Sequence, residues 1–216
     1  MSDVKLAAKR VPRAVREREM LDAAVAEFAR AGFHAASMDD VAARAGISKP
    51  MVYAYLGTKE DLFIACLQRE GTRVMESIVG AVNADLAVDE QLWRGLLAFF
   101  RHVAADRDGW TILYQGARGR FADEVEKMRE RMVDVVAGML TRALGARGGH
   151  AMPAEVTGLA YGLIGAVESL ANHMLDDPSE APETVAARLM NVVWLGASQL
   201  LSGATWPASS SDPRDI

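Results

Sequence analysis

Residues 37–63 read SMDDVAARAGISKPMVYAYLGTKEDLF, and this stretch decides the fold that we predict for the chain. It predicts two short helices joined by a tight turn, followed by a break into a third helix. Ser37 can cap the first helix through its hydroxyl group, with two acidic residues in the electrostatically positive first turn. Gly46 can adopt the left-handed backbone conformation that ends a helix and redirects the chain.

The second short helix is predicted over residues 49–56. Ser48 is placed to cap it, and Pro50 is tolerated because the amides of a first turn lack intrahelical partners. Gly57 and Thr58 end this helix, and Thr58 can cap a long third helix that runs from about Lys59 into the low eighties. A helix–turn–helix of this kind offers its second helix to the major groove of DNA.

The rest of the chain predicts helices only. Upstream, the apolar spacing of residues 16–31 fits one helical face, which Gly32 ends. Downstream, helices are expected at about 85–105, 108–117, 121–144, 153–175 and 183–203. We therefore predict an all-α fold of about nine helices in total. The predicted regions are a disordered basic arm (1–15), a helix–turn–helix DNA-binding domain (16–60), a helical body (61–205) and a disordered tail (206–216).

The distribution of charge restricts the functions that the chain can have. The formal net charge of -5 excludes a uniformly basic nucleic-acid binder. Residues 1–56 nevertheless carry nine Lys or Arg against seven Asp or Glu, a local charge of +2, so the remainder of the chain is acidic. This sign fits an N-terminal region that faces DNA.

Other features indicate a cytoplasmic protein without a metal or cofactor. Cys66 is the single cysteine, which excludes an internal disulfide and a cysteine-rich zinc site and fits a reducing compartment. The four histidines lack the paired spacing of a metal site. No secretory signal precedes the first helix, and the most apolar helices are either too short for a membrane span or interrupted by polar residues.

Residues 16–63 closely resemble the DNA-binding domain of the TetR family of one-component transcriptional regulators. Residue types, spacing and order agree together over somewhat under a quarter of the chain. The matching segments are LDAA (21–24), FA (28–29), GF (32–33), SMDDVA (37–42), AGISK (45–49), VY (52–53) and KEDLF (59–63). The resemblance implies a dimer that is more often a repressor. It also implies that the helical body is a ligand-binding and dimerisation domain, in which ligand binding changes the spacing between the two DNA-binding domains.

The resemblance also implies which side chains contact double-stranded DNA. In the family, the residues that match Tyr53 and Lys59 contact backbone phosphate. The predicted DNA-binding residues are Ser37, Ser48, Tyr53, Thr58 and Lys59 at phosphates, Lys49, Met51 and Tyr55 at bases, and Arg44 in support from the preceding helix. For each tyrosine the alternative is local packing, and a methionine can offer only apolar contact, for example to a thymine methyl group.

Aromatic and methionine side chains of the body are candidates for a ligand pocket, although such residues at helical spacing also form ordinary core. Polar residues on otherwise apolar helices are also candidates for ligand contact, because a buried polar group needs a hydrogen-bonding partner. The predicted ligand-binding residues are Phe99, Phe100, His102, Trp110, Tyr114, Met128, Met132, Tyr161 and Glu168. As a group they favour an apolar small-molecule effector over a highly charged one.

The last two helices predict a homodimer, because two consecutive helices this apolar exceed what one small body must bury. Small residues near i, i+4 spacing permit close approach of a second helix; the alternative is packing within one chain. The predicted interface residues are Gly158, Leu159, Gly162, Leu163, Ala166, Leu170, Leu189, Val192, Val193, Gly196 and Leu200. Two-fold symmetry then predicts a near-palindromic operator.

Two other functions compete with a ligand-released repressor. An enzyme is disfavoured, because the glycine-rich segments 116–120 and 145–149 lack the strand and the Lys-Ser/Thr of a phosphate loop, and Cys66 fits a core thiol. The second alternative is a helix–turn–helix dimer without small-molecule sensing, which a protein partner controls or which acts as an activator.

Overall fold

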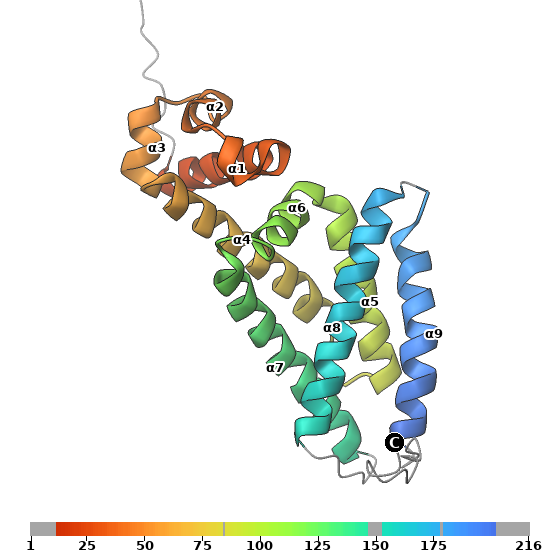
Figure 1. Cartoon of the computed structure of the whole chain (residues 1–216). Helices are drawn as coiled ribbons and strands as arrows, with labels where there is room; N and C mark the ends of the chain where they lie inside the picture. Colours follow the sequence, from red (N-terminus) through yellow and green to blue (C-terminus); the bar gives the residue numbers. More distant parts are fainter. Residues whose placement is uncertain (1–11, 84, 147–152, 178, 202–216) are drawn as a thin grey trace, which may run out of the picture. The chain divides into compact units, whose positions relative to one another are not determined.

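A computed structural model describes residues 12–83, 85–146, 153–177 and 179–201 of the chain. These residues form nine helices and no strand, which confirms the predicted all-α fold (Figure 1). The helices are α1 (Arg13–Ala35), α2 (Met38–Arg44), α3 (Lys49–Leu56), α4 (Lys59–Ala81), α5 (Val88–Ala105), α6 (Arg107–Gly116), α7 (Ala122–Ala146), α8 (Pro153–Asp176) and α9 (Pro182–Leu201).

The first helix begins earlier than predicted. Helix α1 begins at Arg13, because the carbonyl of Pro12 accepts hydrogen bonds from the amides of Val15 and Arg16, each at 3.1 Å. A proline before the first turn loses nothing there, since it has no amide to pair. Residues 1–11 of the predicted arm and the predicted tail over 206–216 lie outside the described residues.

The described chain divides into two compact units. The first takes the described residues up to Val74 together with Asp106–Met128, and the second takes Met75–Ala105 together with the described residues from Arg129 on. These units differ from the predicted ranges 16–60 and 61–205, because α6 packs against α1. Apolar spacing within one helix could not reveal that contact.

The core of the first unit is built around phenylalanine rings. Phe28 of α1 lies edge-on to Phe63 of α4, with ring centroids 4.9 Å apart. Phe121 approaches Phe63 at 4.6 Å and Phe33 at 4.7 Å. The chain bends at Gly32, whose φ of 73° interrupts the helical backbone of α1 where the sequence predicted an end. The bend separates Phe28 from Phe33, which both remain in the same aromatic cluster.

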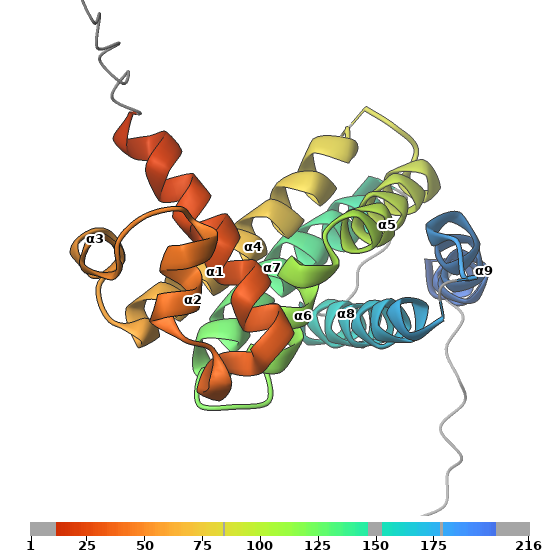
Figure 2. The same ribbon diagram turned by 90° about the horizontal axis from the view of Figure 1, so that it is seen from above.

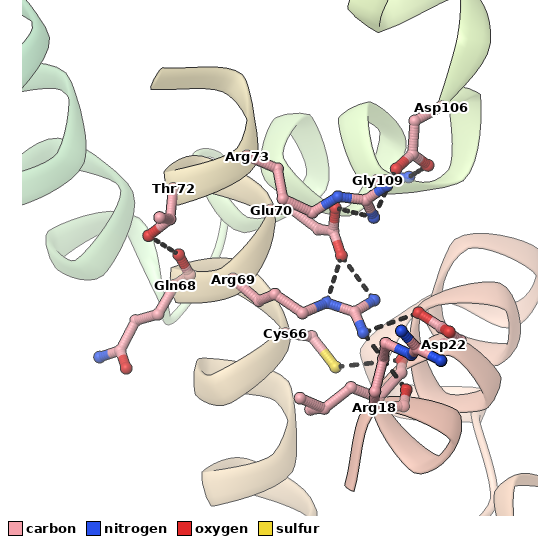
Figure 3. A network of polar contacts seen from close by, with 11 residues as sticks. Arg18, Asp22, Cys66, Gln68, Arg69, Glu70, Thr72, Arg73, Asp106 and Gly109 are labelled. Carbon is pink, nitrogen blue, oxygen red and sulfur yellow. Dashed lines mark hydrogen bonds and ion pairs between the residues drawn. The ribbon is translucent and has the colours of Figure 1, made fainter. Parts of the chain in front are cut away.

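A buried ion-pair network connects three helices of the first unit (Figure 3). Glu70 of α4 is only 1% exposed, and its carboxylate accepts a hydrogen bond from Nε of Arg69 at 2.7 Å. Arg73 donates to the same carboxylate at 3.0 Å and contacts Asp106, before α6, at 2.9 Å. Arg69 also contacts Asp22 of α1 at 2.7 Å. The network therefore holds α1, α4 and the start of α6 together.

In the second unit, α5, α8 and α9 pack against one another (Figure 1). Val133 of α7 packs with Ala160 and Ile164 of α8 in an apolar cluster. At the edge of these helices Arg129 of α7 donates two hydrogen bonds to the carboxylate of Glu168 on α8, at 2.8 and 3.1 Å. Among the described residues, no helix is long and apolar enough to span a membrane.

Candidate nucleic-acid interface

The turn between α2 and α3 has the backbone geometry that the sequence predicted. Gly46 has a φ of 66°, and the amides of Gly46 and Ile47 donate to carbonyls of the last turn of α2, at 3.2 and 3.0 Å. Val41 of α2 and Val52 of α3 are both fully buried. They fix the two short helices against the core, so the opposite side of α3 faces outward (Figure 2).

Two of the four predicted DNA contacts on α3 are exposed. Lys49 is exposed and Tyr53 is 44% exposed, whereas Met51 and Tyr55 are half-buried. This placement agrees with the prediction that Val52 points inward. The roles of the outward side chains at phosphate or base remain predictions.

Of the caps predicted for the two short helices, one is confirmed and the other is wrong. The hydroxyl of Ser37 accepts a hydrogen bond from the amide of Asp39 at 3.1 Å, as an N-cap should. Ser48 occupies the N-cap position of α3, but its hydroxyl accepts no capping hydrogen bond. A cap bonds the second or third amide of a helix; Pro50 has no amide, and that of Met51 donates to the Ser48 carbonyl at 2.9 Å.

An ion pair joins the two helices at the outward surface. Nζ of Lys49 donates to Oδ2 of Asp39 on α2 at 2.9 Å, with the lysine side chain 44% exposed and the aspartate 67% exposed. The hydrogen bond from Asp39, together with its negative charge, raises the pKa of Lys49 above its usual value. Sequence reasoning selected Lys49 and missed Asp39, which is ten residues away.

The remaining DNA candidates of this surface are held by other contacts. Lys59 donates to the carbonyl of His34 at 3.1 Å and lies 4.9 Å from the centre of the Phe33 ring. The Thr58 hydroxyl donates to Asp61 at 2.7 Å and lowers the pKa of that carboxyl. Arg44 lies 3.8 Å from the buried carboxylate of Glu27. These contacts orient cationic and hydroxyl groups near the ends of α2 and α3.

Arg13 is a further basic residue of this surface, and the sequence prediction placed it in the disordered arm. Its guanidinium lies 5.3 Å from the centre of the Tyr55 ring. A guanidinium over an aromatic face is attracted by the negative face of the ring. Arg13 therefore adds a positive charge beside α3 that only the tertiary structure reveals.

The predicted ligand-binding residues are divided between the two units. Trp110, Tyr114 and Met128 belong to the first unit, and the other six belong to the second. Phe99, Phe100 and Trp110 are buried. Tyr161 is 44% exposed, Glu168 is bound by Arg129, and the guanidinium of Arg118 lies 3.9 Å from the centre of the Tyr114 ring. Neither unit by itself contains the whole predicted set.

The predicted dimer interface is partly exposed on the single chain. Leu159 is 45% exposed and Val192 is 73% exposed. Gly158, Gly162 and Gly196 are also exposed, and a Cβ atom added to any of them would meet nothing within 4 Å. The half-buried members are Leu163, Ala166, Leu170 and Val193. Leu189 is 5% exposed and packs inside the chain, and the side chain of Leu200 lies outside the described residues.

Cys66 is buried in the core of the first unit. Burial raises the pKa of its thiol to about 12, so the reactive thiolate is scarce near neutral pH. Within the described residues, no three His, Cys, Asp or Glu side chains gather in a group that could hold a metal ion.

Comparison with known protein families gives two matches that together cover most of the chain. The family described as "Bacterial regulatory proteins, tetR family" matches residues 20–66, which contain α2, α3 and the turn between them. The family described as "Tetracyclin repressor-like, C-terminal domain" matches residues 88–196, about half of the chain.

Individual relatives agree with these matches. The HTH-type transcriptional activator FasR of Mycolicibacterium smegmatis is 30% identical over 139 residues, which make up 63% of this chain and 64% of FasR. The crystal structure of a TetR-like transcriptional regulator from Rhodococcus sp. RHA1 is 37% identical, with a TM-score of 0.74, and the match covers 88% of this chain and 99% of that one.

FadR from Bacillus subtilis, solved in complex with stearoyl-CoA, is a more distant structural neighbour. It is 19% identical with a TM-score of 0.69, and the match covers 87% of this chain and 99% of FadR. At this identity the likeness shows the shared fold alone.

Proposed function

The chain belongs to the TetR family of bacterial regulatory proteins, and from that premise we propose that it binds a near-palindromic operator as a homodimer and represses transcription until an apolar small molecule releases it. The observation that carries the DNA-binding part is the α2–turn–α3 geometry. Val52 is buried in the core and anchors α3, while Lys49 and Tyr53 of the same helix are exposed.

The chemistry of that outward side suits the major groove. Lysine is a donor to guanine O6 and N7, and the tyrosine hydroxyl can donate to a phosphate oxygen. Arg13, Arg44 and Lys59 add positive charge at the ends of the short helices. Phosphate contacts of this kind position the protein, and contacts to base edges specify the sequence.

The homodimer is proposed from the exposed apolar surface of α8 and α9. Leu159, Val192 and Leu195 are all more than 40% exposed. The exposed glycines of the same two helices leave their backbones open to a second helix. A second copy that covered this surface would form an isologous interface and make the operator two-fold symmetric.

A long-chain acyl group is the effector class that we propose to test first. The predicted ligand-binding set is dominated by aromatic and methionine side chains, which favour an apolar ligand. FadR, which shares this fold, was solved with stearoyl-CoA. The proposal concerns the acyl chain, because it is the part of such a molecule that an apolar pocket recognises.

Two successive measurements test the proposal. The purified full chain is first used to select duplexes from a random-sequence library, and near-palindromic sequences are expected. A labelled selected duplex is then titrated with stearoyl-CoA and, as a control, with free coenzyme A, while fluorescence anisotropy reports binding. Release by stearoyl-CoA alone is expected. Selection of no sequence would overturn the DNA-binding role, whereas selection followed by identical responses to both compounds would overturn only the acyl effector.

An activator is the second candidate function, because FasR is named a transcriptional activator. Transcription in vitro from a promoter that carries the selected duplex distinguishes the two modes. A repressor lowers transcript yield when the effector is absent. A yield that rises on addition of the protein would establish activation instead.

A further inference from the structure

The ion pair between Lys49 and Asp39 joins the two helices of the helix–turn–helix at the surface that faces DNA in the proposed function. We infer that Asp39 is a specificity-determining residue, which together with Lys49 reads a G·C base pair in each half-site. Lys49 would donate to the guanine and Asp39 would accept from the cytosine amino group. The inference rests on the proposed function, because it requires that α3 enters the major groove.

The exposure of the pair argues against a purely structural role. The side chains are 44% and 67% exposed, so the ion pair is solvated and contributes little to the stability of the fold. Lys49 is the first residue of α3, and Asp39 lies in the first turn of α2. Both therefore belong to helix ends on the outward side, where side chains can reach base edges.

The donor and acceptor pattern of the pair matches a G·C base pair. Guanine presents the acceptors N7 and O6 in the major groove, and its partner cytosine presents an amino donor beside O6. The ammonium group of Lys49 and the carboxylate of Asp39, 2.9 Å apart, present a donor beside an acceptor. Each group of the protein can thus meet its complement without breaking the ion pair.

The charges explain why such a pair favours specificity over affinity. Lysines that neutralise phosphates release counterions and strengthen binding to any sequence. Asp39 already neutralises Lys49, and its own carboxylate is repelled by phosphates. Binding to a sequence that offers no donor to Asp39 is therefore weakened by the unpaired carboxylate. A cytosine at the right position offsets this loss by donating a hydrogen bond to it.

Asp40 provides a matched control. It is the other acidic residue in the first turn of α2, and it is also exposed. Its carboxylate adds the same charge to the protein and the same favourable interaction with the helix dipole. Asp39→Asn and Asp40→Asn therefore change the net charge alike; Asp39 is the one paired with Lys49, whereas Asp40 interacts electrostatically with Arg30.

The test compares the wild-type chain with Asp39→Asn, Asp40→Asn and Lys49→Ala. The probes are the duplex that the wild-type chain selects from a random-sequence library and a shuffled duplex of equal composition. Anisotropy titrations at several KCl concentrations are expected to show tighter binding of Asp39→Asn to the shuffled duplex. For this variant, the slope of the logarithm of the binding constant against the logarithm of the KCl concentration should become more negative by about one. The reason is that the released lysine neutralises roughly one more phosphate. The preference for the selected duplex should fall about tenfold.

Repeating the selection with Asp39→Asn is expected to weaken the preference for a G·C base pair at one position per half-site and to leave the other positions intact, because the asparagine oxygen still accepts a hydrogen bond but carries no charge. Lys49→Ala should lose the preference for the same G·C base pair. If Asp39→Asn and Asp40→Asn behave alike, or if neither residue governs a G·C position, the inference is overturned while the proposed function stands. If the wild-type chain selects no sequence, the proposed function itself falls. Thermal melts of every variant report folding independently.

Discussion

Asp61 and Thr58 cap helix α4 reciprocally, immediately after the helix proposed to enter DNA. The amide of Thr58 donates to Oδ2 of Asp61 at 2.9 Å, and the amide of Asp61 donates to the Thr58 hydroxyl at 3.1 Å. Two amides that a helix start leaves without backbone partners are thereby satisfied. The sharp turn between α3 and α4 depends on this cap and on Gly57, whose φ is 74°.

Gly57→Ala is expected to destabilise the first unit by roughly 2 kcal/mol, since its backbone conformation is open almost only to glycine. A Cβ atom at this position would also lie 2.6 Å from Oδ2 of Asp61 and disturb the cap. Gly80→Ala is the control, because Gly80 lies in the last turn of α4 and a Cβ atom there meets nothing within 4 Å. It should leave stability unchanged or raise it by up to about 1 kcal/mol. Urea unfolding at fixed protein concentration measures both, and equal effects would contradict the strain at Gly57.

Tyr53→Phe is expected to weaken binding to the selected and the shuffled duplex by the same factor, about fivefold for one lost hydrogen bond. The side chain is 44% exposed, so removing its hydroxyl should not affect folding. A contact to phosphate carries no sequence information, and the ratio of the two affinities should therefore stay constant. A change in that ratio would show that Tyr53 contacts a base instead.

Glu70→Gln is expected to lower stability by roughly 2 kcal/mol, because it removes the charge that Arg69 and Arg73 share in a buried network (Figure 3). Glu76→Gln serves as the control, since Glu76 is exposed on the same helix and should change stability by less than about 0.5 kcal/mol. Urea unfolding measures the free energy of unfolding of both variants. A Glu70→Gln protein as stable as the control would mean that the network contributes no net stability.

Much of the DNA-facing fold follows from local signals in the sequence. The predicted limits of the second short helix, residues 49–56, agree with α3, because Ser48 and Gly57 adopt non-helical backbone conformations directly before and after it. Ser48 still failed as a side-chain cap. The reason is local as well, since Pro50 supplies no amide at the position that a cap would bond.

Tertiary contacts account for what the sequence did not predict. Asp39 approaches Lys49, and Arg13 approaches Tyr55, only after the helices have packed. Glu70 is a charged residue of the kind expected on an exposed helix face, yet it is buried. Arg69 and Arg73 of the same helix neutralise its carboxylate, and Asp22 of α1 and Asp106 before α6 bind those two arginines in turn. Helical periodicity describes one helix and carries no information about which polar residues its neighbours will bury.

Cys66 is expected to resist thiol reagents in the folded protein and to react after unfolding. At pH 8 a thiol with a pKa of about 12 has almost no thiolate, and burial blocks access to it. The raised pKa means that the folded state keeps a proton that the unfolded state releases above about pH 9. The contribution of the Cys66 thiol to the free energy of unfolding is therefore complete below pH 9 and is lost as the pH rises toward 12. Colour formation with Ellman's reagent, with and without urea, measures the reactivity; rapid reaction of the folded protein would contradict the burial.

Gly162→Leu is expected to convert the proposed dimer into monomers without unfolding the chain. A Cβ atom at Gly162 meets nothing within 4 Å, so the single chain can accommodate a larger side chain on the exposed surface of α8. At a close helix–helix interface the same side chain would keep the two backbones apart. Gly80→Leu is the control, because Gly80 is equally open but lies on α4, outside the predicted interface. Light scattering at several protein concentrations measures the mass, and circular dichroism confirms folding. A Gly162→Leu protein that keeps the mass of a dimer would show that α8 does not form the interface at this position.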